Sequence, residues 1–223
     1  MNKAFRNHAG MRRPAQLAIA LALGAGVLAG CAPVVLGGAA VGALVATDRR
    51  TSGAQLEDEG IELRSSNRLR DAFGDRAHIN VTSYNRQVLL TGEVPNAQDK
   101  QAAERLVSGV DNVRSIVNEL AVMPNTSLSQ RANDSLISGK VKASFVDAKD
   151  LYANAFKVVT ERGTVYLMGR VTRREAERAT EITRGIDGVQ KVVRLFEIIS
   201  DEDLQRMLPT PPAAPASAPA SAS

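Results

Sequence analysis

Two stretches of the chain share one alternation of apolar and polar positions. Residues 79–94 (INVTSYNRQVLLTGEV) align without a gap with residues 156–171 (FKVVTERGTVYLMGRV). Apolar side chains fall at every second position in each half of both stretches, which predicts a β-hairpin with one buried face. Residues 109–122 also align with residues 185–198 once the offset shifts by one residue. The chain therefore carries two copies of one unit of roughly seventy residues.

Each hairpin also predicts a tight turn and a close backbone approach. The turns are expected at the polar residues 84–86 and 161–163. Gly92 and Gly169 occupy equivalent positions in the second strands. Glycine at such a position suits a bulge or the close approach of another backbone.

A helix is expected after each hairpin. Asn96 can cap the first of these helices, and Thr172 forms a capping box with Glu175 at the start of the second. Matching apolar stripes at helical spacing follow, namely Ala103, Leu106 and Val110 in the first copy and Ala179, Ile182 and Ile186 in the second. A third strand is then expected at residues 113–122 and 189–198.

A helix is also expected before each hairpin. One helical face carries Ile61, Leu69 and Phe73 in the first copy and Ile137, Val141 and Phe145 in the second. Each unit is therefore predicted as helix, strand, strand, helix, strand, an α+β fold whose three-stranded sheet packs on two helices. A unit of about seventy residues is near the lower limit for an independent core, so packing of the two units together would stabilise both.

The helix expected at residues 132–147 has a second apolar row. Because successive residues turn by about 100° around a helix, this row faces away from the core row. The row consists of Leu136, Gly139, Ala143 and Val146, and Lys140 and Lys142 flank it. Such a face suits a lipid interface, where each lysine near an anionic surface adds ~1 kcal/mol.

Acidic residues oppose the interpretation of this helix face as a lipid interface, and an alternative role is open to its apolar residues. Asp134 and Asp147 lie at the ends of the helix. Leu136 and Val146 could instead pack against the other unit or against the segment that precedes it. The corresponding helix of the first unit is more charged on its outer face, through Glu62, Arg64, Arg68, Arg70 and Asp71, which is typical of a solvated or protein-facing surface.

The first thirty residues have the composition of a signal peptide. Basic residues, but no acidic ones, precede an apolar run at residues 15–28, which is shorter than the ~20 residues of a membrane span. A second apolar run at residues 33–47 is also too short and predicts either an interfacial segment or a flexible tether. The basic residues of the leader are Lys3, Arg6, Arg12 and Arg13.

Charge and composition argue against several classes of function. Without the four leader residues, 24 of the 28 basic residues remain beside 24 acidic ones, so no global basic field is available for nucleic acid. His78 is the only histidine beyond the leader, and it is interpreted as structural. Motifs for phosphate loops or serine nucleophiles are not found. We therefore expect no catalytic residues, no metal, no cofactor and no small-molecule substrate.

Cys31 is the only cysteine of the chain and follows Leu28, Ala29 and Gly30. This run resembles the lipobox of bacterial lipoproteins. The resemblance implies cleavage of residues 1–30 and attachment of lipid at Cys31. The alternative is an ordinary secretory signal with a chance cysteine. Position 32 is alanine rather than the aspartate that commonly retains such proteins in the inner membrane, which favours the outer membrane.

The repeated motif V-x-L-x-G-x-V stands at residues 88–94 and 165–171. With G-V-x-x-V before the last strand and V-T-x-R-E-A at residues 171–176, each unit resembles a BON domain. Behind a lipobox, the pair resembles the dual BON-domain lipoproteins of the outer membrane. The expected organisation is a signal peptide at 1–30, a lipidated tether at 31–55, BON domains at 56–124 and 129–200, and a disordered Pro/Ala/Ser tail at 205–223.

The resemblance implies a protein without enzymatic activity on the periplasmic face of the outer membrane. Such proteins bind anionic phospholipid, such as phosphatidylglycerol, through the first helix of the second domain, and they support envelope integrity at the division site. The lipid-contact positions of the family correspond to Leu136, Val141 and Val146, although helical spacing places Val141 in the core. The expected contact set is Leu136, Lys140, Val141, Lys142, Ala143 and Val146. The alternative is a lipid-tethered adaptor that binds envelope-assembly, division or wall-remodelling proteins.

Overall fold

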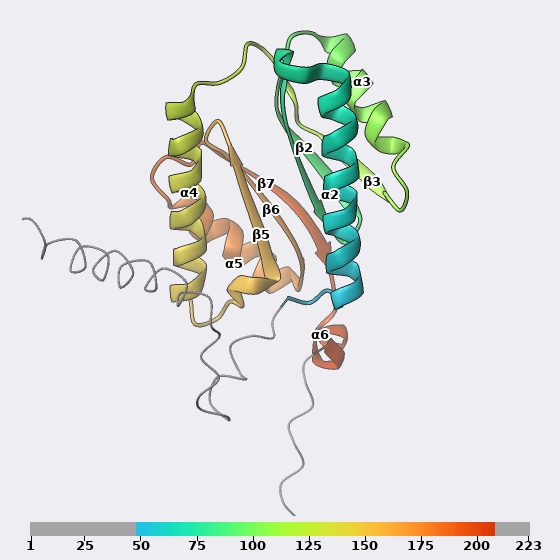
Figure 1. Ribbon diagram of the computed structural model, residues 1–223. Coiled ribbons are helices and arrows are strands. Elements are labelled where there is room, and N and C mark those ends of the chain that lie inside the picture. Colours follow the sequence, from blue (N-terminus) through green and yellow to red (C-terminus); the bar gives the residue numbers. More distant parts are fainter. Residues whose placement is uncertain (1–47, 208–223) are drawn as a thin grey trace, which may run out of the picture. The chain divides into compact units, whose positions relative to one another are not determined.

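The computed structural model describes residues 48–207, which contain both copies of the repeat. The predicted signal peptide, Cys31, nearly all of the expected tether and most of the expected tail lie outside the described residues. The first copy folds in the predicted order (Figure 1). Its elements are α2 (Ser52–Phe73), the 3₁₀ turn η2 (Gly74–Arg76), β1 (His78–Tyr84), β2 (Gln87–Val94), α3 (Ala97–Ser108), β3 (Ser115–Asn118) and β4 (Ala121–Val122).

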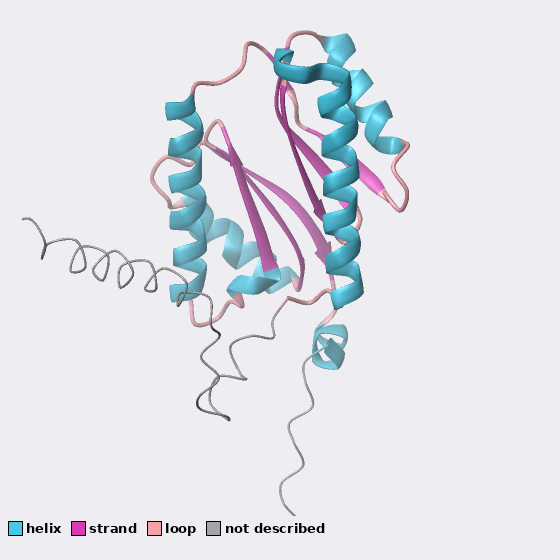
Figure 2. Ribbon diagram, in the orientation of Figure 1, coloured by secondary structure: helices cyan, strands magenta, loops and turns pink. Residues whose placement is uncertain are grey.

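The second copy has the same order of helices and strands (Figure 2). Its elements are α4 (Leu128–Asp147), η3 (Ala153–Ala155), β5 (Phe156–Glu161), β6 (Thr164–Val171), α5 (Arg173–Arg184), β7 (Lys191–Ile198) and a short α6 (Asp201–Met207). The strand order is β5-β6-β7, with an antiparallel hairpin and a parallel third strand. The predicted α+β fold of two tandem BON domains is confirmed.

The third strand of the first domain differs from the expected continuous strand at 113–122. It is divided into β3 and β4, both of which pair in parallel with β2. The side chain of Asn118 turns toward α3, where its amide donates to the carbonyl of Lys100, and its oxygen accepts the amide of Leu120. A local side-chain bond of this kind competes with regular strand pairing.

Several elements begin or end outside the expected bounds. Thr51 caps α2 by accepting the amide of Ala54, so this helix starts within the segment assigned to the tether at 31–55. Ser127 caps α4 in the same way, so α4 starts four residues before the expected Ala132. The helix α6 was not predicted and extends into the segment assigned to the tail at 205–223.

Each domain has its own core between helices and sheet. The core rows predicted for α2 and α4 are buried, with Ile61 and Val141 both fully inaccessible. The predicted capping of α3 by Asn96 and the capping box of α5 are both present. Helical spacing and capping residues were therefore sufficient to predict the layer of helices on each sheet.

The expectation of one buried face per sheet is wrong for the central strands. Leu89 of β2 and Met168 of β6 point away from their own helices and are fully buried. They form a third cluster with Tyr84 and Tyr166, to which strands of both domains contribute. The two sheets therefore pack against each other through the faces that the helices leave uncovered.

Gly92 and Gly169 lie where backbones approach closely, as predicted. A Cβ atom on Gly92 would lie 2.0 Å from the carbonyl oxygen of His78, and one on Gly169 would lie 2.5 Å from that of Ala155. Only glycine fits at these distances, which explains the V-x-L-x-G-x-V motif of both copies.

Candidate functional site

The outer face of α4 carries an exposed apolar row. Leu136 and Val146 are 66% and 71% exposed, and Gly139 and Ala143 between them are exposed as well. The observed start of α4 adds Leu128 to this row, and Ala132 lies on the same face. We call the complete row the outer ridge; it consists of Leu128, Ala132, Leu136, Gly139, Ala143 and Val146. At ~1.5 Å per residue it extends for ~27 Å along the helix.

Lysines flank the outer ridge on both sides. Lys140 lies on one flank and Lys142 lies on the other, and both are exposed. Within residues 48–207 neither of them forms an ion pair, whereas the arginines of this part of the chain form many. The positive charge of this face is therefore available to an external anion.

The structure changes the role of one acidic residue of α4. Asp134 is buried, and its carboxylate accepts the backbone amides of Arg162 and Gly163, each at 2.8 Å. It thus caps the β5–β6 turn and presents no charge to a surface. Asp147 remains exposed at the C-terminal end of α4.

Val141 is removed from the expected contact set. It is fully buried in the core of the second domain with Ile137 and Phe145. The position implied by the family resemblance fails here because α4 must bury one side chain per turn, and Val141 falls between two of these core residues. Leu136, Lys140, Lys142, Ala143 and Val146 remain on the exposed face.

The corresponding helix of the first domain has a different surface. Leu56 and Leu63 of α2 are 71% and 64% exposed, but two acidic side chains of this helix are paired with basic ones. Arg64 contacts Glu57 at 2.8 Å, and Lys157 of β5 contacts Glu62 at 2.6 Å. The first domain therefore lacks the combination of apolar row and unpaired lysines that α4 has, within the described residues.

A second feature of the helices was missed by sequence analysis. Asp58 of α2 stands three residues before Ile61, just as Asp134 stands three residues before Ile137. The carboxylate of Asp58 accepts hydrogen bonds from the amides of Asn85 and Arg86 in the β1–β2 turn, each at 2.7 Å. The signal was available, because an aspartate repeats at the same place in both copies.

Charged side chains also join the two domains. Arg162 lies 2.5 Å from Glu93, which accepts a further bond from Thr126, and His78 lies 3.1 Å from the same carboxylate. Burial alone would raise the pKa of Glu93, but these hydrogen bonds outweigh it and lower the pKa. Burial raises the pKa of the neighbouring Glu161.

This cluster is the one place in residues 48–207 where ligand atoms for a metal gather. Donor atoms of His78, Glu93 and Glu161 lie within 4.8 Å of one another. However, the guanidinium of Arg162 already supplies the counter-charge to Glu93. The arrangement is therefore an interdomain ion pair. A divalent cation bound there would be repelled by the guanidinium of Arg162.

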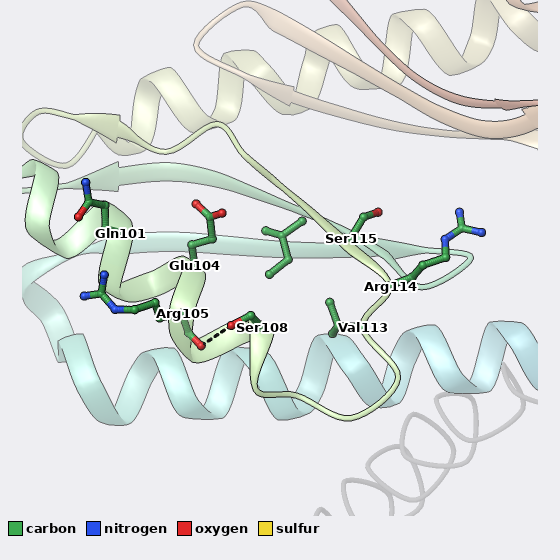
Figure 3. A pocket seen from close by; sticks show the side chains of 8 residues that line it. Gln101, Glu104, Arg105, Ser108, Val113, Arg114 and Ser115 are labelled. Atoms are coloured by element: carbon green, nitrogen blue, oxygen red, sulfur yellow. Dashed lines mark hydrogen bonds between the residues drawn. The ribbon is translucent and has the colours of Figure 1, made fainter.

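A cavity of about 490 Å³ lies between α3 and β3 of the first domain, and Figure 3 shows the side chains that line it. Charges of both signs line it, from Glu104 of α3 and from Arg105 and Arg114. Ser108 is bonded to the carbonyl of Arg105 within it. Mixed charge around a polar cleft suits another protein better than an apolar ligand.

A substitution at Gly139 tests the environment of the outer ridge and leaves its charge unchanged. A Cβ atom at this position meets nothing within 4 Å. We expect Gly139→Ala to raise the free energy of unfolding by about 0.5–1 kcal/mol, because glycine is a poor helix former. Urea unfolding would measure the change. The matched variant Gly169→Ala should destabilise the same domain, because its Cβ would lie 2.5 Å from the carbonyl oxygen of Ala155. Equal changes in the free energy of unfolding for the two variants would contradict an open environment at Gly139 and a crowded one at Gly169.

Within residues 48–207 no helix is both long and apolar enough to cross a bilayer. The sequence matches the BON domain family at residues 57–124 and 133–200. It is 42% identical to the "Outer membrane lipoprotein DolP" of Haemophilus influenzae over 185 residues, which cover 81% of this chain and 95% of that protein.

Two more distant relatives have the same kind of similarity. The chain is 33% identical to the "21 kDa hemolysin" of Actinobacillus pleuropneumoniae, over 68% of this chain and 79% of that one. It is 28% identical to the "Osmotically-inducible protein Y" of Escherichia coli, over 51% and 58% of the two chains. With two matched domains and this similarity over most of its length, the chain belongs to the BON-domain family as a dual-domain, DolP-like member.

Proposed function

We propose that this protein is an envelope lipoprotein that binds anionic phospholipid through the outer ridge of α4. Acyl chains on Cys31 hold it to the periplasmic face of the outer membrane. It acts by binding rather than by catalysis. One observation carries the proposal, namely that an exposed apolar row lies between lysines that no acidic side chain of residues 48–207 neutralises.

The similarity to an outer membrane lipoprotein supports the proposed location. The lipobox-like run before Cys31 and the alanine at position 32 agree with it. A role in envelope integrity, concentrated at the division site, follows from the family resemblance and is part of the proposal.

The charge and the apolar area of α4 each contribute a modest free energy. The two lysines near an anionic surface together contribute about 2 kcal/mol. Leu136 and Val146 add the burial of apolar side chains at the headgroup boundary. Such a sum gives weak, reversible binding, so the acyl chains would supply the stable anchoring and α4 would determine how the domains meet the bilayer surface.

Glutamate substitutions on the outer ridge test the lipid contact. We expect Leu136→Glu or Val146→Glu to weaken binding to phosphatidylglycerol vesicles by about 2 kcal/mol, or roughly thirtyfold, through lost burial and added repulsion. The measurement is sedimentation of residues 32–223 with vesicles, in a form that carries no lipid. Vesicles of a neutral lipid should bind less of the unsubstituted protein.

Leu63→Glu is the matched control for these variants. Leu63 is 64% exposed on α2, close to the 66% of Leu136. The control should bind vesicles as the unsubstituted chain does. If Leu63→Glu and Leu136→Glu weaken binding equally, the outer ridge is not the lipid contact.

The second candidate function is a lipid-tethered adaptor for envelope-assembly, division or wall-remodelling proteins. The mixed-charge cavity between α3 and β3 favours it. This candidate takes precedence if the unsubstituted protein fails to bind anionic vesicles and the α4 variants change nothing.

A further inference from the structure

Arg49 is buried against the second domain. Its guanidinium makes two bonds to the carboxylate of Glu175, at 2.7 and 2.8 Å, and a third to the carbonyl of Arg170 at 3.0 Å. The side chains of Arg49 and Glu175 are only 5% and 1% exposed. Burial alone would raise the pKa of Glu175, but its bonds to Arg49 and Thr172 outweigh burial and lower the pKa. Arg49 is therefore fixed to the start of α5.

Arg50 is fixed to the first domain in a similar way. It lies 2.7 Å from Asp58 of α2 and 2.7 Å from Asp48. Its guanidinium also stacks 4.3 Å from the centre of the Tyr84 ring. Two successive residues thus contact different domains, at the point where the described chain begins.

The position of Arg49 also relates this point to α4. Its guanidinium lies 5.7 Å from the ring centre of Tyr152. Tyr152 follows the C-terminal end of α4 by five residues and is 47% exposed. An exposed tyrosine with an apolar ring and a polar tip is suited to a membrane–water interface.

We infer that Asp48, Arg49 and Arg50 form an anchor clamp that holds the exit of the lipid-bearing segment beside the C-terminal end of α4. This end of the outer ridge, with Val146 and Tyr152, then enters the bilayer more deeply than the end at Leu128. The inference rests on the proposed function, because it requires both the lipid at Cys31 and docking of α4.

Covalent geometry explains why the exit point matters. Cys31 precedes Asp48 by seventeen residues, which limits its reach to about 60 Å. This reach exceeds the ~27 Å of the outer ridge, so the tether can bring either end of α4 to the bilayer, but stretching it toward the far end costs chain entropy. The clamp therefore favours the near end of α4, and a chain released from it would lose this preference.

Depth-dependent quenching tests the clamp in the full acylated protein. Val146→Cys and Leu128→Cys variants carry a fluorescent label, while the native Cys31 sulfur is blocked by lipid. In vesicles that contain phosphatidylglycerol and a bromine-bearing lipid, we expect at least twofold more quenching at position 146 than at position 128. The substitution Arg49→Gln should bring the two values together while the acyl chains keep the protein on the vesicles.

Arg178→Gln is the matched control, because Arg178 pairs with Asp150 and Glu181 in the same domain but lies outside the clamp. It should leave the difference in quenching intact. Circular dichroism establishes that Arg49→Gln remains folded. If it does not, Arg49→Lys replaces it, since an ammonium group cannot reproduce the two parallel bonds of the guanidinium to Glu175.

The possible outcomes separate the clamp from the docking surface. Equal quenching at both positions of the unsubstituted protein, or a difference that survives in folded Arg49→Gln or in its replacement Arg49→Lys, overturns the clamp and leaves the docking of α4 in place. Absence of quenching at both positions in the anchored protein overturns the proposed function together with the clamp.

Discussion

Replacement of Asp58 by alanine should lower the free energy of unfolding by about 3–5 kcal/mol, the typical cost of removing one partner of a buried ion pair. Asp58 is 1% exposed and binds Arg50, the hydroxyl of Ser83 and two amides of the β1–β2 turn. The variant leaves the guanidinium and both amides without this acceptor. Urea unfolding at neutral pH would measure the loss.

Asp134→Ala is the matched comparison. Asp134 caps the equivalent turn but binds only the amides of Arg162 and Gly163 among the described residues. Its loss should cost about 1–3 kcal/mol, the desolvation penalty of unpaired polar groups. A larger loss for Asp134→Ala than for Asp58→Ala would contradict the importance given to Arg50.

The effect of Asp58 should also depend on pH. Burial alone would raise its pKa, but bonds from Ser83, Arg86, Arg50 and Asn85 outweigh burial and lower it. A lowered pKa in the folded state stabilises the protein above the carboxyl pKa of the unfolded chain, ~3.9, and this stabilisation is lost as the pH falls through the folded value. The stability curves of the unsubstituted protein and Asp58→Ala should therefore converge in acid.

Leu89→Ala should cost about 2–5 kcal/mol, the usual range for a leucine truncated in a packed core. Leu89 is fully buried although it faces away from the helices of its own domain, because it packs with Tyr166 and Met168 of the other sheet. The loss should therefore lower the stability of both domains. Amide signals from each domain, followed by NMR during urea unfolding, would measure the two transitions.

Leu63→Ala serves as the control for Leu89→Ala, because Leu63 is 64% exposed and its truncation should change stability by less than about 0.5 kcal/mol. Unfolding of the second domain at an unchanged urea concentration in Leu89→Ala would contradict mutual stabilisation by the two sheets.

Helical periodicity was the most informative part of the sequence. The core row of α4 and the row opposite to it follow from spacing alone, and both have the predicted exposure. This is why helical spacing placed Val141 correctly, whereas correspondence with family positions did not. A single helix determines its own faces, so local sequence is sufficient there.

Contacts between distant segments could not be predicted in this way. Leu89 and Met168 break the alternation of their strands, but nothing local shows that a second sheet covers them. Arg49 and Glu175 are 126 residues apart, and a charged residue read alone is most often solvated. Asp58 and Asp134 were missed for the same reason, although their repetition distinguishes them from ordinary surface charges.

The break between β3 and β4 affects how neighbouring molecules meet. It leaves the outer edge of the first sheet with strands of four and two residues. A longer free edge recruits other chains by backbone pairing and leads to aggregates. The second sheet ends in the longer β7, whose Lys191, Arg194 and Glu197 supply charge instead. At these two edges, shortened pairing in the first sheet and charge in the second therefore both oppose the addition of a strand from a neighbouring copy.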